Sequence, residues 1–347
     1  MSDINHAWVL ASHPDGMPAT TDWRLKETPR PSPEDGQVLA RAIYLSVDPY
    51  MRGRISKASN YAAGVSIGEV MHGGAVAEIV ESRHPDWKEG DLIETMGFGW
   101  QEWAVLDPET QGTNGLRRVD PSLGPIHAYL SYLGMPGITA WIAMDTIGRT
   151  KAGETVLVSA ASGAVGQVVG QIAKDKGARA VALASSAEKL AWCRDIGFDE
   201  GINYRERADD LPAAIKQACP DGIDVFFDNT AGPIHDAAMQ NLALNARIII
   251  CGMVANAASF DQPDMGERHL RRILVARARM EGFLIFDHMA RWDEARRALS
   301  QMAEAGHLRF RTDRLEGIEQ MPQAFINLLT SKNFGKQVVQ VSSDPTA

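Results

Sequence analysis

The spacing of apolar residues changes character about halfway along the chain. In the first third, apolar residues gather in short runs rich in Val, Ile and Ala, such as residues 37–47 and 73–82, bounded by Gly, Pro and Asp. Runs of this kind, separated by clustered glycines, are typical of strands joined by tight turns. This region therefore predicts a small β-barrel, with a generic all-β domain as the alternative.

Beyond residue 153, strand-like runs alternate with segments of helical period. The apolar residues at 165, 168, 169 and 172 fall on one face of a helix. Alternation of this kind predicts a doubly wound parallel sheet. The expected strands are residues 155–159, 178–184, 224–227, 247–250 and 282–286, and the expected helices are residues 165–172 and 187–196.

The last part of the chain predicts two amphipathic helices and a final strand. Both helices follow residue 291, and the strand is expected at residues 337–341. Residues 342–347 are expected to be disordered. The apolar face of the second helix consists of Ile318, Met321, Phe325 and Leu328.

The length, charge and composition of the chain argue against some classes of binding partner. The chain has 347 residues and a formal net charge of −9, and its length favours two domains. Nucleic acid is not expected as a partner because phosphate binding needs a basic face. A membrane is not expected either, since no apolar stretch reaches the ~20 residues that span a bilayer. Three scattered cysteines, Cys193, Cys219 and Cys251, argue against a disulfide framework and indicate the cytoplasm.

A glycine-containing turn lies between the first strand of the predicted parallel sheet and its helix. It comprises Ser162, Gly163, Ala164, Val165 and Gly166. The two glycines would allow a pyrophosphate to approach the backbone and the helix to lie close to the strand. The helix N-terminus would then present N–H groups to the anion. The turn predicts a dinucleotide site, and a tight turn without a ligand is the alternative.

The end of the second strand distinguishes NADPH from NADH. A strand that binds NAD ends in an acid that holds the ribose hydroxyls, whereas this one ends in Ser185 and Ser186. Lys189 follows within one helical turn, and Tyr204 ends a later segment. A cation and a phenol suit an additional phosphate. NADPH is therefore predicted, with a solvated lysine and a packed tyrosine as the alternatives.

Several short motifs of the chain resemble those of a known family. An Asp-Pro-Tyr-Met-Arg segment occupies residues 48–52, and a Leu-Gly-Met-Pro-Gly segment occupies residues 133–137. Phe-Asp-Asn at 227–229, Cys-Gly-Met at 251–253 and Asn-Phe-Gly-Lys at 333–336 complete the pattern. The chain resembles the zinc-independent medium-chain dehydrogenases/reductases that include prostaglandin, curcumin and alkenal double-bond reductases.

The resemblance implies an α/β protein with two domains. A GroES-like β-barrel catalytic domain would span residues 1–128 and be completed by 303–347, and a Rossmann NADPH-binding domain would span 129–302. It also implies a homodimer, formed through strands near residues 279–286. Besides the residues above, the implied cofactor contacts are Met135, Thr139, Asn229, Cys251, Gly252, Met253, Phe283, Leu284, Ile285 and Asn333.

The resemblance also predicts a site without zinc. In zinc-dependent relatives a cysteine ligand would stand near Asp48, and a histidine is missing from residues 67–69. His72 is then expected to be structural or solvent-facing. Without a Lewis acid, another group must stabilise negative charge on the substrate oxygen.

By resemblance, Tyr50 and Tyr61 are the catalytic candidates, and both would contact the substrate. Packing roles are their alternatives. Arg52 is expected to bind an acidic substrate group or to pair with an acid structurally. Many relatives carry a tyrosine in the segment around Asn256 that this chain lacks, and Asn256 is the candidate there for a weaker hydrogen bond to the substrate. The predicted function is NADPH-dependent reduction of the C=C bond of enals or enones. An NADPH quinone reductase and a catalytically weak NADPH sensor are the alternatives.

Overall fold

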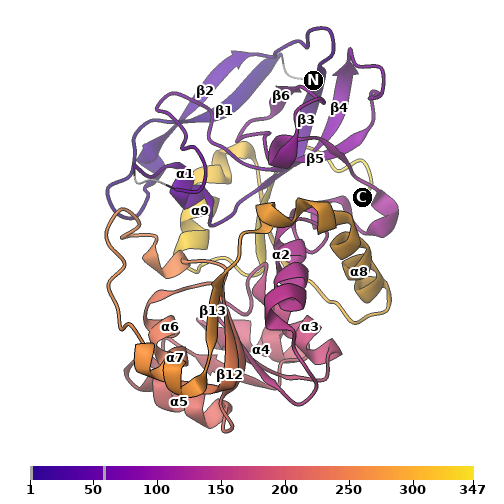
Figure 1. Ribbon diagram of the computed structural model, residues 1–347. Coiled ribbons are helices and arrows are strands. Elements are labelled where there is room, and N and C mark those ends of the chain that lie inside the picture. Colours follow the sequence, from indigo (N-terminus) through magenta and orange to yellow (C-terminus); the bar gives the residue numbers. More distant parts are fainter. Residues whose placement is uncertain (1–2, 58–59) are drawn as a thin grey trace. The chain divides into compact units, whose positions relative to one another are not determined.

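The computed structural model describes residues 3–57 and 60–347, and the chain divides into two compact units (Figure 1). The first comprises Met1–Ser131, Ala257–Gln262 and Thr312–Ala347, and the second comprises Tyr132–Asn256 and Pro263–Arg311. The sequence places the domain boundaries at 128/129 and 302/303. It does not anticipate that the short segment Ala257–Gln262 clusters with the first unit.

The first unit is built on a mixed sheet with strands from both ends of the chain. Its order is β14-β15-β3-β4-β5-β7, β6 also pairs with β3, and β1 and β2 form a separate ribbon. The elements of this unit are β1 Ile4–Leu10, β2 Trp23–Pro29, β3 Val38–Ser46, α1 Met51–Arg54, β4 Ala75–Ser82, β5 Leu92–Thr95, β6 Trp103–Leu106, β7 Arg117–Arg118, β14 Thr312–Glu316, α9 Met321–Leu329 and β15 Lys336–Gln340.

A buried ion pair joins the two ends of the chain within this sheet. The Lys336 ammonium lies 2.6 Å from Oδ1 of Asp48 and donates to the Ser46 hydroxyl and the Val47 carbonyl oxygen, both at 2.8 Å. The Ser46 hydroxyl also donates to Asp48. Lys336 and Asp48 are only 1% and 4% exposed. The charges are tolerated because each has a partner and further hydrogen bonds.

The second unit is a Rossmann domain. Its sheet has the order β10-β9-β8-β11-β12-β13, and every pair is parallel. Strands β8, β9 and β10 follow one another towards one edge of the sheet. The chain then crosses back and places β11, β12 and β13 on the other side of β8. The elements of this unit are α2 Met135–Ala143, β8 Thr155–Val158, α3 Gly166–Asp175, β9 Arg179–Ala184, α4 Ala187–Asp195, β10 Glu200–Asn203, α5 Leu211–Ala218, β11 Ile223–Asp228, α6 Gly232–Ala238, β12 Leu242–Ile250, α7 Leu270–Ala276, β13 Arg279–Gly282 and α8 Trp292–Glu304.

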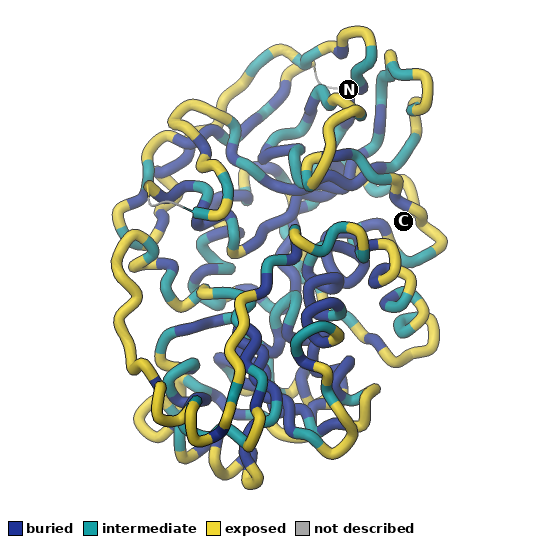
Figure 2. Tube along the Cα trace, viewed as in Figure 1, coloured by how far each residue is buried: buried dark blue, intermediate teal, exposed yellow. Residues whose placement is uncertain are grey.

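Helices cover the sheet of the second unit, as a parallel sheet requires. Apolar residues of α5 and α6, such as Ile215 and Ile234, form one core with Leu157 of β8 and Phe226 of β11. Helix α3 packs against β8 and β9. The central strands are accordingly buried along their length (Figure 2).

Two sequence expectations are wrong. The strand expected at residues 282–286 lies earlier, as β13 Arg279–Gly282, and Ile285–Arg291 forms a 3-10 turn. The tail at residues 342–347 is not free of contacts, because Asp344 accepts a hydrogen bond from the Tyr44 hydroxyl and Ser342 donates to Ala42. Within the part of the chain that the structure describes, no helix combines the length and apolarity that a membrane span needs.

Removing one partner of the Lys336–Asp48 pair should be more damaging than removing both charges. Lys336→Met leaves a buried carboxylate unpaired, so it should lower the free energy of unfolding by about 3–5 kcal/mol. The double variant Lys336→Met/Asp48→Asn should recover much of that loss. Urea unfolding of the full chain measures both, and a double variant as unstable as the single one would contradict this account.

Candidate functional site

The parallel sheet gathers most of the predicted cofactor residues at one edge. The turns that follow parallel strands lie at the same edge of a sheet, and the crevice between β8 and β11, where the strand order reverses, is where ligands bind in such folds. The segments that follow the strands, either turns or the first residues of helices, contain Ser162, Gly163, Ala164, Val165 and Gly166 after β8, Lys189 after β9, Tyr204 after β10, Asn229 after β11, Cys251, Gly252 and Met253 after β12, and Phe283, Leu284 and Ile285 after β13.

The turn after β8 has the geometry that a pyrophosphate requires. Helix α3 begins at Gly166, and no side chain caps its first turn, which leaves backbone N–H groups there for an anion. A Cβ at Gly163 would lie 3.1 Å from the carbonyl oxygen of Ala160, and one at Gly166 would lie 2.7 Å from Cα of Ala161. Both glycines therefore permit close backbone approaches, and the turn fits a dinucleotide.

The residues predicted to hold the additional phosphate follow neighbouring strands: Lys189 lies in the first turn of α4, after β9, and Tyr204 directly follows β10. The Tyr204 N–H donates to the carbonyl oxygen of Ala184 at 3.2 Å, which places it beside the end of β9. The Ser186 hydroxyl caps α4 by accepting from the Lys189 N–H at 3.3 Å. Tyr204 also packs against the hydrophobic core. Phosphate contacts by Lys189 and Tyr204 stay predictions.

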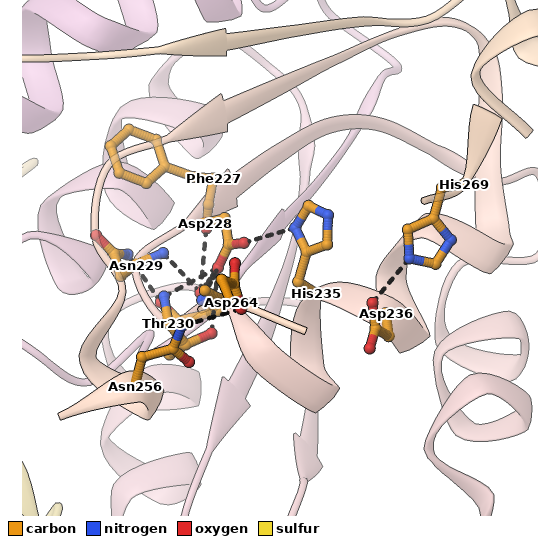
Figure 3. A network of polar contacts seen from close by, with 11 residues as sticks. Phe227, Asp228, Asn229, Thr230, His235, Asp236, Asn256, Asp264 and His269 are labelled. Atoms are coloured by element: carbon orange, nitrogen blue, oxygen red, sulfur yellow. Dashed lines mark hydrogen bonds and ion pairs between the residues drawn. The ribbon is translucent and has the colours of Figure 1, made fainter. Parts of the chain in front are cut away.

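A buried carboxylate organises the turn after β11, a role that the sequence motif did not reveal. Asp228 has no exposed surface. Its Oδ1 accepts from the Ser159 hydroxyl, from the N–H and hydroxyl of Thr230, and from the Ala231 N–H, at 2.9–3.1 Å (Figure 3). Asn229 donates to Ser159 through both its backbone and its side chain, at 2.8 Å each. Asp228 therefore locks together the turns after β8 and β11.

Two histidines extend this network. Nδ1 of His235 lies 2.9 Å from Oδ2 of Asp228, and Nε2 of His269 lies 2.8 Å from Asp236 (Figure 3). Burial by itself would lower the pKa of His235, but the hydrogen bond and charge of Asp228 outweigh it and leave the pKa raised. Asn256 donates to Asp264 at 3.2 Å nearby, so its amide already has a partner within its own unit.

The two predicted catalytic tyrosines lie around one arginine in the first unit. The guanidinium carbon of Arg54 is 5.7 Å from the ring centroids of both Tyr50 and Tyr61. The Tyr50 hydroxyl lies 3.2 Å from Nδ1 of His72. Tyr61 is 50% exposed. The sequence did not single out Arg54, and it assigned His72 no chemistry, because nothing local to residue 72 points to residue 50.

The geometry of Arg52 favours the structural alternative. Its side chain is 2% exposed. Nε donates to the Ala257 carbonyl oxygen at 2.8 Å, and Nη2 donates to Gly16 and approaches Asp261 at 3.4 Å. Ser56 also donates to Asp261. Arg52 thus holds the segment Ala257–Gln262 through Nε and Nη2, whereas its Nη1 is buried without a hydrogen-bond partner among the described residues, and the expected contact with a substrate acid stays a prediction.

The remaining predicted cofactor residues have definite places. Met135 and Thr139 lie in the first turns of α2, where Thr139 is buried. Asn333 belongs to the first unit, and its side-chain amide donates to the Gly335 carbonyl oxygen at 2.9 Å. The cofactor contacts predicted for these three residues stay predictions.

Comparison with known proteins places the chain in a family. A family described as the N-terminal domain of oxidoreductase matches residues 6–113, and one described as zinc-binding dehydrogenase matches residues 164–304. The NADPH-dependent curcumin reductase of Escherichia coli strain K12 is 40% identical, with 98% of each chain covered. The 2-alkenal reductase (NADP(+)-dependent) of Nicotiana tabacum is 37% identical, again with 98% of each chain covered. The chain belongs to the medium-chain dehydrogenase/reductase family.

Within this family the chain falls among the prostaglandin, curcumin and alkenal reductases, and it is an oxidoreductase. The crystal structure of CurA from Vibrio vulnificus in complex with NADPH superposes with a TM-score of 0.90 at 38% identity, covering 97% of this chain and 99% of that one. The GroES-like and Rossmann folds implied by the resemblance are confirmed.

The description of one of the two families that match this chain, zinc-binding dehydrogenase, mentions zinc. Among residues 3–57 and 60–347, no group of three or more His, Cys, Asp or Glu side chains is placed to hold a metal ion. Asp48, which the resemblance aligns with the first zinc ligand, is paired with Lys336. A zinc-free reaction stays a prediction.

The two glycines of the reductase's dinucleotide turn should respond differently to an added methyl group. Gly166→Ala places Cβ against backbone that cannot rotate away, so it should cost about 1–3 kcal/mol of stability and weaken dinucleotide binding. Gly163→Ala has a looser contact and should mainly weaken binding. Thermal unfolding and titration of reduced-dinucleotide fluorescence measure the two effects. Equal losses of stability would contradict the assigned close approach.

Proposed function

We propose that this reductase transfers a hydride from NADPH to the β-carbon of α,β-unsaturated aldehydes or ketones and then protonates the resulting enolate. The observation that carries the cofactor choice is the end of β9. Ser185 and Ser186 stand there in place of an acid, and the backbone hydrogen bond from Tyr204 to Ala184 brings Tyr204 beside the end of β9, the strand that the helix of Lys189 follows. An acid would repel the additional phosphate, whereas a cation and a phenol attract it.

The names of the relatives support the substrate class. Curcumin and 2-alkenals both contain a C=C bond conjugated to a carbonyl, and the two relatives named for reducing them match nearly the whole chain. When bound, NADPH supplies the hydride. The chain must orient the two reactants, stabilise negative charge on the carbonyl oxygen and deliver a proton to the α-carbon.

Tyr50 and Tyr61 suit the last two tasks. Burial raises the pKa of both phenols, most strongly for Tyr50, although the charge of Arg54 opposes the increase. Both hydroxyls therefore stay protonated across the neutral range, where they can donate hydrogen bonds or protons. A phenol donor replaces the Lewis acid on which zinc-dependent relatives rely.

We also propose that the protein works in a reducing compartment, the cytoplasm. The three cysteines are free thiols in the structure. Burial raises the pKa of Cys193, Cys219 and Cys251 to about 12. Since the thiolate is the reactive form, these residues should be inert, and the reaction should not require them.

Turnover with a panel of enals, enones, quinones and saturated aldehydes tests the function. Oxidation of NADPH by enals or enones is expected, with kcat/KM at least tenfold higher for NADPH than for NADH because one charge-assisted contact is worth about 1.5–3 kcal/mol. Lys189→Ala should remove most of that preference, and the exposed Lys176→Ala, at the far end of α3, is the matched control. Quinone-only turnover would favour a quinone reductase, and tight NADPH binding without turnover would favour a sensor.

We further propose a homodimer formed through β13. This strand is an edge of the parallel sheet, and all four of its residues are exposed. Leu270, Leu274 and Val275 of the adjacent α7 are 64–74% exposed. An uncovered strand edge beside apolar side chains favours association with a second copy.

A charge on this surface should separate the subunits. Light scattering should give twice the 37.8 kDa chain mass for the unmodified protein, and Leu274→Glu should shift it towards the single-chain mass because it would bury a charge. Leu244→Glu, at another exposed leucine, should leave the mass unchanged. A monomer at all concentrations for the unmodified protein would overturn the dimer.

A further inference from the structure

We propose that His72 and Arg54 are positioning residues that make Tyr50, rather than Tyr61, the proton donor of the reaction. The inference rests on the proposed function, since a proton donor is needed only if an enolate forms. It assigns a task to two side chains that neither the motifs nor the relatives' names single out.

Tyr50 is the more firmly placed of the two phenols. It directly precedes α1 and lies two residues beyond Asp48, which Lys336 fixes from the partner strand. Its hydroxyl is 3.2 Å from Nδ1 of His72, and the two rings meet edge-on with centroids 5.8 Å apart. A phenol oxygen held beside a ring nitrogen has a defined position, and Tyr50 is also less exposed than Tyr61, which is 50% exposed.

His72 is suited to orient a phenol because it is neutral. Burial, followed by the charge of Arg54, lowers its pKa to about 4, while a hydrogen bond with Asn114 acts in the opposite sense. A neutral imidazole carries one N–H and one acceptor nitrogen. With its proton on Nδ1, His72 donates to the Tyr50 oxygen, which fixes the position of that oxygen, leaves the phenol O–H free for the substrate and stabilises the phenolate that forms.

Arg54 supplies a positive charge that stabilises the Tyr50 phenolate left when the proton departs. Its guanidinium carbon lies 5.7 Å from the ring of Tyr50, and its charge lowers the pKa of that phenol. Nη1 donates to the Ala63 carbonyl oxygen at 2.8 Å, while Nε is buried without a hydrogen-bond partner among the described residues. A buried donor without a partner calls for an explanation, and the guanidinium that carries it lies beside the Tyr50 ring.

A pocket gives this cluster access to water. It has a volume of about 480 Å³, lies within the first unit, and is lined by Arg54, His72, Asn114 and Gln101 among others. Water in this pocket can reach the imidazole that holds the Tyr50 hydroxyl. The phenol can therefore be reprotonated after each turnover without opening the fold.

The proposed reduction consists of hydride addition, protonation of the α-carbon and return of a proton to Tyr50. Hydride adds to the β-carbon, and the electron pair of the C=C bond moves to form an enolate on the carbonyl oxygen. The Tyr50 O–H bond then breaks as the α-carbon–hydrogen bond forms, and the enolate returns to a carbonyl. The tyrosinate that is left beside Arg54 takes a proton from water, which completes the cycle.

The face from which the α-carbon is protonated tests the proposal directly. With an enone that carries a methyl group on its α-carbon, a fixed Tyr50 should give one product enantiomer in large excess. His72→Gln should lower kcat by about tenfold and Tyr50→Phe by about 100-fold, and both should reduce the excess because water protonates the enolate from either face. Arg54→Gln should lower kcat with a larger solvent deuterium isotope effect, and Arg54→Lys should restore part of it.

His127→Gln is the matched control. His127 is another histidine of this unit whose pKa is lowered mainly by burial, and it packs edge-on against a different tyrosine, Tyr44. Its loss should cost comparable stability but leave the enantiomeric excess and the isotope effect unchanged. A full excess in both His72→Gln and Tyr50→Phe, or a loss in Tyr61→Phe alone, would overturn the proposal. No turnover of any enone by the unmodified enzyme would instead reject the proposed function.

The pH profile gives a second readout. The charged or titratable groups around His72 are Tyr50, Arg54 and Glu69 at the pocket wall. Because the His72 pKa is about 4, the ring stays neutral over the working range, and kcat should stay level between about pH 5.5 and 9. An acidic limb near the ordinary histidine pKa that disappears in His72→Gln would show a charged His72 and contradict this arrangement.

Discussion

The ion pair between Lys336 and Asp48 is the interaction on which the first unit depends. It joins β15, near the end of the chain, to the segment that leaves β3, and it satisfies two charges that have almost no exposed surface. Tyr50, α1 and Arg54 follow that segment within a few residues. A displacement of Asp48 would therefore be transmitted along a short stretch of backbone to Tyr50. The same contact therefore supports both the sheet and the backbone position of Tyr50.

The second unit achieves comparable order by a different means. A parallel sheet brings the turns that follow its strands to one edge, so residues more than a hundred positions apart become neighbours without any specific contact between them. Asp228 then adds the specificity, since its carboxylate accepts from the turns after both β8 and β11. Parallel topology supplies the location of the site, and one buried acid supplies its rigidity.

Local patterns predicted the elements of this protein well where the pattern itself has a physical cause. The strand β8, the glycine turn and α3 followed from β-branched residues, from two glycines and from a 3.6-residue period. The strand expected at 282–286 was displaced because an apolar run does not distinguish a strand from the buried turn that follows it. The tail was misjudged because its contacts, from Tyr44 and Ala42, come from residues about 300 positions away.

The sequence by itself determined the parallel-sheet fold class and the dinucleotide turn, because both depend on residue type at short spacing, and the resemblance to a known family added the two tyrosines as candidates. Only the tertiary structure decided what those candidates contact. It placed His72 against Tyr50, directed Arg52 to the segment Ala257–Gln262 and set Arg54 between two phenols. The physical reason is that the direction of a side chain depends on contacts with distant strands and loops. A short stretch of sequence does not specify which residues will make those contacts.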